Sequence, residues 1–518
     1  MKTILLIFIL SCCVSWTSAQ STYNYRLDFD RPTSSVLGSI EVTDSCFYVC
    51  GVANDSLPPF QLGSIFAKIS FEGEVIWYKT LVDSIEYFGT WYNTLEKDNE
   101  NFMVSGTYFD TLGRADLLIK YNADGDTLFT RKYRSPYLPD NGFIALINSI
   151  KAPDDGYYMI SNITNTINSN TDIYLKKVNS LGQFDWGVVY GENQNSEAVG
   201  GMLIEEDKII FGGHINNINF SNQDYFSRAF LVQTNLEGEV EWEYESPVGE
   251  LRNRVSDILK TDDGGYLLAS GKGIEFGQLP GTFLYWQPYV FKLDADRNFE
   301  WGVSIRDSLF HSSNVINKMV EISDGSGYVV AGRSYRPNPL ENGYDYLGLV
   351  AKISKEGDSL WTRRYNHIQS AAENHIFYDL EETPDGGFVM VGQAADFNQL
   401  TGDLPLQRAW IVKVDQHGCL VPGCHLTSPT VELQEASFEI KTYPNPATDY
   451  LNVYFQHPML KETAYFSLVD VSGKTALEFQ SRHGDITHMI PVGGLPSGIY
   501  WLRCRVGEEI LTKEIVVQ

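Results

Sequence analysis

The chain has 518 residues, with 66 acidic side chains against 39 basic ones and a formal net charge of −27. A surface this acidic repels phosphate backbones, which argues against nucleic acid as a partner. Aromatic residues make up 13% of the chain, enough large side chains for an extensive β-rich core.

The N-terminal residues 1–19 have the layout of a secretory signal peptide. Lys2 precedes an apolar run from Ile4 to Leu10, and small residues lead to Ala19, after which we expect cleavage. The run is shorter than the ~20 residues of a membrane-spanning helix, and no later stretch approaches that length, so no transmembrane segment is predicted. The alternative is a lipoprotein signal that anchors Cys12, although Leu10 fits that motif poorly.

Seven segments of eleven residues align without gaps through the middle of the chain. They are AKISFEGEVIW (67–77), IKYNADGDTLF (119–129), KKVNSLGQFDW (176–186), VQTNLEGEVEW (232–242), FKLDADRNFEW (291–301), AKISKEGDSLW (351–361) and VKVDQHGCLVP (412–422). Each reads as a strand, a turn and a second strand, and another strand pair precedes it. Four antiparallel strands repeated seven times predict an all-β fold, a seven-bladed β-propeller, because one unit alone cannot bury both faces of its sheet.

The two ends of the predicted ring complement each other. The seventh segment lacks a convincing last strand, whereas residues 21–30 alternate and have no strand before them. We therefore expect residues 22–30 to join the same sheet as 410–417, which closes the ring and removes an exposed edge. The propeller is predicted to cover residues 20–425.

The repeats loosely resemble the blades of quinoprotein-like bacterial propellers, in which a Gly-x-x-x-Trp turn also enters the outer strand. The segments 291–301 and 351–361 come closest. Quinoprotein dehydrogenases carry adjacent cysteines at their cofactor, and the mature chain has no such pair. We accordingly expect no cofactor and no redox activity.

The cysteines that follow the signal peptide are odd in number. Cys46 and Cys50 are about 13 Å apart at the rise of a strand, which is too far for a disulfide. Cys419 and Cys424 flank a Pro-Gly turn that brings them together. We expect a disulfide between them in an oxidising compartment.

Motifs for catalysis and metal binding are absent where their mechanisms require them. The sequence has no P-loop, nucleophile elbow, zinc-protease motif or dinucleotide fingerprint in a suitable context. Asp124 and Asp126 surround Gly125, but they occupy the hairpin turn that the other repeats share. Turn chemistry is therefore favoured over a calcium loop, and no metal is predicted.

The segments between the second and third strands of the repeats are long and dissimilar, and we expect function there. They include 214–228, 272–289, 333–346 and 394–408. Four of their aromatic residues are candidates for stacking on a sugar or anchoring a protein: Tyr285, Trp286, Tyr335 and Tyr344. The alternative is that these rings pack the loops themselves.

Two classes of function remain open. The sequence favours a non-catalytic binding or adhesion module for a glycan or a surface protein, because the spacing of the acids singles out no catalytic pair. The alternative is a hydrolase or lyase that acts on polysaccharide through acids in the same long segments: Asp224, Glu275, Glu341 and Asp396. Carboxylates that converge at the mouth of the ring would favour the enzyme.

Residues 437–518 begin a separate unit. Alternating stretches at 443–455, 466–480 and 491–518, separated by Gly and Pro turns, predict a small Ig-like antiparallel β-sandwich. Its landmarks are Tyr443-Pro444-Asn445-Pro446, Val471-Ser472-Gly473-Lys474 and Leu495-Pro496-Ser497-Gly498-Ile499-Tyr500. In residue identity and order they closely resemble the C-terminal sorting domain, type A, of type IX secretion cargo from Bacteroidetes.

This resemblance implies export. Such tails route proteins from the periplasm across the outer membrane, and a sortase-like protease removes them while the body is attached to the surface or released. The expected partners are therefore the type IX machinery and that protease, and residues 426–436 are the expected linker and cleavage region. The alternative is an ordinary accessory Ig-like domain.

Overall fold

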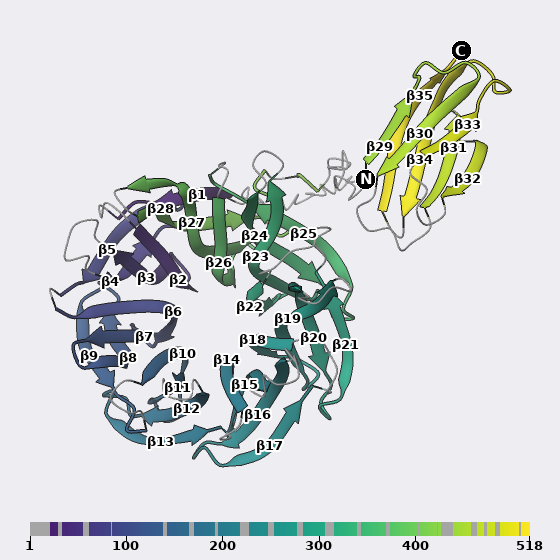
Figure 1. The fold of residues 1–518 in the computed structure, drawn as a ribbon. Coiled ribbons are helices and arrows are strands. Elements are labelled where there is room, and N and C mark those ends of the chain that lie inside the picture. Colours follow the sequence, from purple (N-terminus) through teal and green to yellow (C-terminus); the bar gives the residue numbers. More distant parts are fainter. Residues whose placement is uncertain are drawn as a thin grey trace, which may run out of the picture. The chain divides into compact units, whose positions relative to one another are not determined.

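A computed structural model presents the chain as strands and turns (Figure 1). The residues that it describes are 21–29, 34–54, 62–83, 85–137, 142–164, 170–191, 195–217, 227–246, 253–276, 283–305, 315–338, 343–368, 373–401, 404–421, 423–425, 439–456, 464–470, 474–481, 487–506 and 509–518. Among these residues, none forms a helix with the length and apolarity to cross a membrane.

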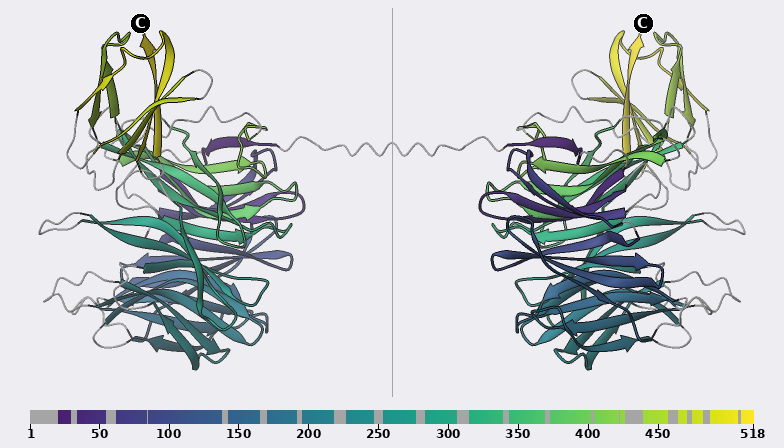
Figure 2. Two further views of the ribbon diagram at one scale, coloured as in Figure 1. Left: turned by 90° about the vertical axis from the view of Figure 1, so that its right-hand side faces the viewer. Right: turned by 90° about the vertical axis from the view of Figure 1, so that its left-hand side faces the viewer.

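The chain separates into two compact units that divide between Cys424 and His425. In the first unit, which we call the body, the strands form antiparallel four-stranded sheets arranged as a ring (Figure 1). Seen edge-on, the strands run across the thickness of this ring (Figure 2). The body is therefore an all-β, propeller-like fold.

Four repeats of the body form separate sheets. Repeat 2 is β6 (Tyr87–Asp98), β7 (Asn101–Asp110), β8 (Gly113–Asn122) and β9 (Thr127–Tyr133); repeat 3 is β10 (Phe143–Lys151), β11 (Tyr157–Thr164), β12 (Thr171–Val178) and β13 (Phe184–Tyr190). Repeat 4 is β14 (Asn195–Glu205), β15 (Lys208–Asn217), β16 (Ser227–Asn235) and β17 (Val240–Glu245); repeat 5 is β18 (Asn253–Lys260), β19 (Tyr266–Phe276), β20 (Phe283–Leu293) and β21 (Phe299–Ser304).

The other repeats join into one larger sheet through single parallel bridges, Ser34 with Gln407 and Tyr346 with Asn374. Repeat 6 is β22 (Val315–Glu321), β23 (Tyr328–Asn338), β24 (Gly343–Ile353) and β25 (Ser359–Tyr365); repeat 7 is β26 (Glu373–Glu382), β27 (Phe388–Thr401), β28 (Leu404–Val414) and β1 (Tyr23–Leu27). Repeat 1 is β2 (Ser34–Val42), β3 (Phe47–Asn54), β4 (Leu62–Ile69) and β5 (Val75–Leu81).

The N-terminal strand closes the ring, as predicted. β1 pairs antiparallel with β28 from Tyr23 opposite Lys413 to Leu27 opposite Ala409. Thr22 donates its hydroxyl to the Leu420 carbonyl at 2.6 Å. The first strand of the body therefore completes the sheet of the last repeat.

Turn chemistry and packing between repeats explain why glycine recurs in the hairpin of the aligned segments. Gly357 has a φ of +91°, and a Cβ on it would lie 2.7 Å from the Trp301 ring of the preceding repeat. A Cβ on Gly125 would likewise lie 2.6 Å from the ring of Trp77 in the preceding repeat. The close approach of turn to ring leaves no room for a side chain, so glycine serves both the positive φ and the contact.

Most of the hydrophobic core lies between neighbouring repeats. One cluster joins Leu267 and Val290 of repeat 5 to Tyr328 and Leu349 of repeat 6, all nearly inaccessible to solvent. Each sheet therefore buries its faces against the sheets beside it, which is the reason the sequence needs several repeats to fold.

The expectation of long loops between the second and third strands is wrong for 272–289, 333–346 and 394–408, whereas most of 214–228 lies outside the described residues. β19 and β20 pair from Tyr266 opposite Leu293 out to Phe276 opposite Phe283, and β27 and β28 pair as far as Thr401 opposite Leu404. Aromatic and β-branched residues favour extended structure, and here they continue the strand pairing beyond the body's core. The variable segments are mostly long hairpins.

The second unit is a small sandwich of two sheets, described here by itself. One sheet has the order β29 (Glu439–Tyr443), β30 (Tyr450–Gln456) and β33 (Thr487–Pro491). The other has the order β32 (Thr475–Ser481), β31 (Ala464–Asp470), β34 (Gly498–Val506) and β35 (Glu509–Val517). Leu451, Phe466 and Leu502 are buried in the shared core.

Candidate functional site

The aromatic candidates from the sequence lie in strands. Tyr285 pairs opposite Ile274 and Trp286 opposite Gly273 in the β19–β20 hairpin. Tyr335 pairs opposite Tyr346 and Tyr344 opposite Pro337 in the β23–β24 hairpin. The structure brings each pair onto one hairpin end, and the side chains of these four residues lie outside the part that it describes.

The acids proposed for an enzyme do not form a described cluster. Asp224 and Glu341 lie outside the described residues, as does the side chain of Glu275. Asp396 is buried, with 1% of its surface exposed, in the strand β27 opposite Glu373.

Other acids, on the innermost strands, connect neighbouring repeats. The Asp379 carboxylate accepts hydrogen bonds from the Ser39 hydroxyl at 2.5 Å and the Ile40 N–H at 3.0 Å. Glu381 accepts from the Val42 N–H at 3.0 Å, and Glu96 accepts from the Lys151 N–H at 2.7 Å. These acids accept hydrogen bonds from backbone N–H groups that do not donate to a neighbouring strand.

Two of the innermost acids titrate near neutrality. Burial, followed by the charge of Asp379, raises the pKa of Glu381 to about 8. Burial also raises the pKa of Glu96 to about 7. Perturbed acids are candidates for catalysis in general, but each of these already holds the neighbouring repeat by a hydrogen bond.

The cysteine turn holds a disulfide. Cys419 and Cys424 are bonded, with their Cα atoms 5.7 Å apart, whereas Cys46 and Cys50 are buried and not joined by a disulfide. The Asp415 carboxylate accepts the Cys419 N–H at 2.8 Å, so it stabilises the turn that leads into the disulfide.

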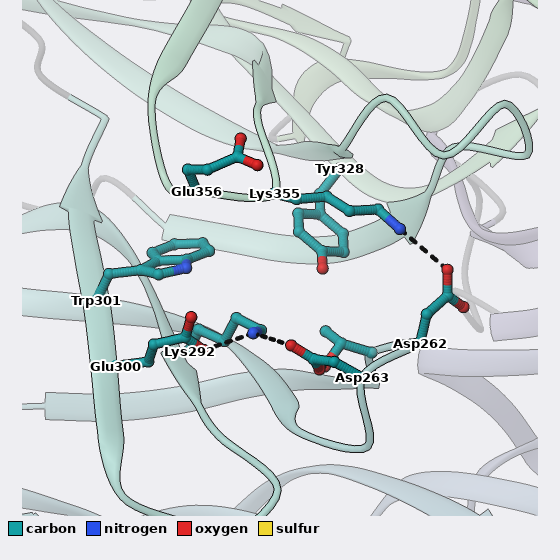
Figure 3. Close-up of a pocket in the computed structure, with 9 residues that line it drawn as sticks. Asp262, Asp263, Lys292, Glu300, Trp301, Tyr328, Lys355 and Glu356 are labelled. Atoms are coloured by element: carbon teal, nitrogen blue, oxygen red, sulfur yellow. Dashed lines mark hydrogen bonds and ion pairs between the residues drawn. The ribbon is translucent and has the colours of Figure 1, made fainter.

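A cavity of about 440 Å³ lies between repeats 5 and 6 (Figure 3). We call it the inter-repeat pocket, and the residues that line it are Thr261, Asp262, Asp263, Lys292, Glu300, Trp301, Tyr328, Lys355 and Glu356. They come from the turn after β18, from β20 and β21, from the start of β23 and from the turn between β24 and β25. The pocket therefore lies on the face of the short turns, opposite to the face of the long segments between the second and third strands, where we expected function.

The two ammonium groups of the inter-repeat pocket are neutralised by carboxylates. Lys292 contacts both Asp263 and Glu300, and Lys355 lies 2.9 Å from Asp262 (Figure 3). The hydrogen bond from Lys292 lowers the pKa of Asp263 to about 2, so this carboxylate is charged at every physiological pH.

One ion pair of this pocket recurs in several repeats. The second position of the aligned segments is lysine in all but one of them, where Gln233 replaces it. Lys120 contacts Asp98, Lys177 contacts Asp154, and Lys413 contacts Asp385, as Lys292 contacts Asp263. The Lys292–Asp263 pair by itself is therefore structural.

Two hydrogen-bond donors distinguish the inter-repeat pocket from the corresponding positions of other repeats. The buried indole nitrogen of Trp301 has no acceptor among the described residues. The Tyr328 hydroxyl also borders the cavity, and no carboxylate hydrogen bond is among the causes that raise its pKa to about 12, of which burial is the largest. Figure 3 shows both groups facing the cavity. In comparable positions of repeats 3 and 5, the Tyr157 hydroxyl donates to Asp98 at 2.5 Å and the Tyr266 hydroxyl donates to Glu205 at 2.9 Å.

The sorting landmarks hold the second unit together. Asn445 donates to the Glu514 carbonyl at 3.0 Å and accepts the Val516 N–H at 2.8 Å, which fixes the turn at Pro444 and Pro446 against β35. Tyr443 ends β29 with half its surface exposed. Gly498 begins β34, and the nearby Tyr500 is buried and donates to the Pro496 carbonyl. Gly473 lies outside the described residues.

The comparison with known proteins gives a family match for the second unit. Residues 441–518 match the family model of the secretion system C-terminal sorting domain. The tail therefore directs the protein through type IX secretion to the cell surface or the extracellular space. No curated protein matches the chain.

Solved propeller structures show distant similarity. Drosophila Semaphorin 2a is 9% identical, with 96% of this chain and 98% of that chain covered and a TM-score of 0.45. Penicillium chrysogenum alpha-L-arabinanase is 15% identical, with 63% and 93% covered and a TM-score of 0.37. The GH93 alpha-L-arabinofuranosidase of Fusarium graminearum is 14% identical, with 76% and 98% covered and a TM-score of 0.38. Likeness at this level carries no conclusion about function.

Proposed function

We propose that the protein is an exported, non-catalytic binding protein, whose body is a seven-bladed β-propeller that takes a ligand in the inter-repeat pocket. In this account residues 1–19 are a signal peptide, 20–425 the propeller, 426–436 the linker and 437–518 the sorting domain. A sortase-like protease removes the sorting domain at the cell surface or in the medium.

One observation carries the binding function: the inter-repeat pocket presents the buried Trp301 Nε1, which has no acceptor among the described residues, together with the Tyr328 hydroxyl and fixed carboxylates. Buried donors that lack a partner cost free energy, and a ligand that accepts from them recovers it. A cavity of about 440 Å³ is within the range of small-ligand sites. The aromatic residues at the ends of the β19–β20 and β23–β24 hairpins are a second proposed contact surface, for a glycan or a surface protein.

The alternative is a hydrolase or lyase acting on polysaccharide. The observation in its favour is the raised pKa of Glu96 and of Glu381, since a general acid needs to keep its proton near neutral pH. Against it, both carboxylates accept backbone hydrogen bonds from the next repeat. Burial is the largest cause of both raised pKa values, so a structural position explains them without a catalytic role.

Retention without turnover tests the proposal. Purified full chain is passed over immobilised polysaccharides, and bound protein and released reducing sugar are both measured. We expect retention that Trp301→Phe weakens, with no released sugar. Release of sugar that Glu96→Gln abolishes would instead establish the enzyme.

Export is tested by deleting residues 437–518. We expect the truncated protein to accumulate in the periplasm, while the full chain reaches the surface or the medium. Truncated protein at the surface would show that the tail is not the export signal.

A further inference from the structure

The inter-repeat pocket has a charge balance that restricts its ligand. The side chains of Asp262, Asp263, Glu300 and Glu356 bring four negative charges to its lining, against two positive charges from Lys292 and Lys355. Both ammonium groups are already engaged, because Lys355 also lies 3.0 Å from Glu321. An anionic ligand would meet a net negative wall with no free cation to pair with it.

The donors of the pocket restrict the ligand further. Trp301 Nε1 needs an acceptor and the Tyr328 hydroxyl is able to donate to one, whereas a simple ammonium ion has none to offer. Glu356 is exposed at the rim, and its carboxylate has no partner among the described residues, so it is able to accept a hydrogen bond from a ligand. A hydroxyl group both donates and accepts, which satisfies the two needs at once.

The shape of the pocket agrees with this chemistry. The Trp301 ring forms one wall, and the Tyr328 ring stands across the cavity from Asp263 and Glu300 (Figure 3). Tyr328 is 1% exposed, so packing fixes its orientation. Sites that recognise small polar ligands combine aromatic walls with a few placed polar groups.

We infer that the inter-repeat pocket binds an uncharged saccharide, whose hydroxyl groups accept from Trp301 and Tyr328 and donate to the carboxylates. This inference rests on the proposed binding function and deepens it by naming the class of ligand. The site belongs to the interface of repeats 5 and 6, because its donors are contributed by one repeat each.

A binding series with matched variants tests the inference. The full chain is titrated with neutral oligosaccharides, a uronic-acid oligosaccharide and spermidine, and dissociation constants are measured by calorimetry. Trp301→Phe keeps a ring against Gly357 but removes the donor, and Tyr328→Phe removes only a hydroxyl. Trp242→Phe is the control, because Trp242 holds the corresponding position in repeat 4, where Arg297 covers its ring at 4.4 Å.

We expect a neutral saccharide to bind, with each pocket variant weakening it about tenfold and Trp242→Phe leaving it unchanged. Tighter binding of spermidine or the uronic acid, weakened by the same variants, would overturn the class of ligand while leaving a binding pocket. Saccharide binding that neither pocket variant changes would overturn the assignment of the pocket itself. Thermal melting of all three variants verifies that each is folded.

Discussion

Ring closure by β1 yields a quantitative prediction. Leu27 is 6% exposed and packs into a cluster with Ile40 of repeat 1 and Val391 of repeat 7, so it links both sides of the closure. Leu27→Ala leaves a cavity there, and we expect it to lower the free energy of unfolding by about 2 to 5 kcal/mol. Urea denaturation followed by circular dichroism measures the change. Arg26→Ala is the control on the same strand, expected to cost less than about 0.5 kcal/mol.

The whole strand contributes more than this one residue. Tyr23, Leu27 and Phe29 are all at least nine-tenths buried, and at ~1.5 to 3 kcal/mol each their burial amounts to roughly 5 to 9 kcal/mol as an upper estimate. That is similar to the total stability of many domains. Deletion of 21–29 should therefore unfold repeat 7 or the entire body. A Leu27→Ala variant no less stable than Arg26→Ala would refute the closure of the ring by β1.

Three further predictions concern a turn, a buried acid and the disulfide of the body. Gly357→Ala should destabilise the body more than Gly113→Ala, since both have positive φ but only the former meets a tryptophan ring, and melting temperatures compare them. The raised pKa of Glu381 stabilises the body below about pH 4.5, and this contribution is lost as the pH rises through about 8; a Glu381→Gln variant should show a flatter fall in melting temperature across that range. Mass mapping without reductant should find the peptide containing Cys419 and Cys424 lighter by a pair of hydrogen atoms, and two free thiols would contradict the disulfide.

The sequence was sufficient to predict the repeated four-stranded unit and its closure. The aligned segments repeat their turn residues without gaps, and the period of two in residues 21–30 indicated a strand that needed a partner. Local patterns of this kind predict a strand, a turn and a second strand from neighbouring residues alone. The sorting tail was predictable for the same reason, since its landmarks occur at short spacing.

The inter-repeat pocket could not be predicted in this way. Asp262 and Lys355 form an ion pair across 93 residues of sequence, and no local pattern records that they meet. The lysine at the second position of the aligned segments was a visible signal, but it marks a structural pair found in several repeats. What is particular to repeats 5 and 6 is a tyrosine without its carboxylate partner, and only the arrangement of neighbours reveals that.

The long hairpins were missed for a different reason. Variability among segments such as 272–289 suggests loops, although their aromatic and β-branched residues favour strands. Strand pairing of Ile274 with Tyr285 needs no resemblance between repeats, because backbone hydrogen bonds do not depend on side-chain identity.

A crystal of the full chain soaked with the neutral saccharide that binds best would show whether the inter-repeat pocket takes a sugar. We expect density for the sugar within the inter-repeat pocket, with a hydroxyl oxygen within hydrogen-bond distance of both Trp301 Nε1 and the Tyr328 hydroxyl. Density for the sugar elsewhere on the body, with the inter-repeat pocket occupied by water alone, would contradict this expectation.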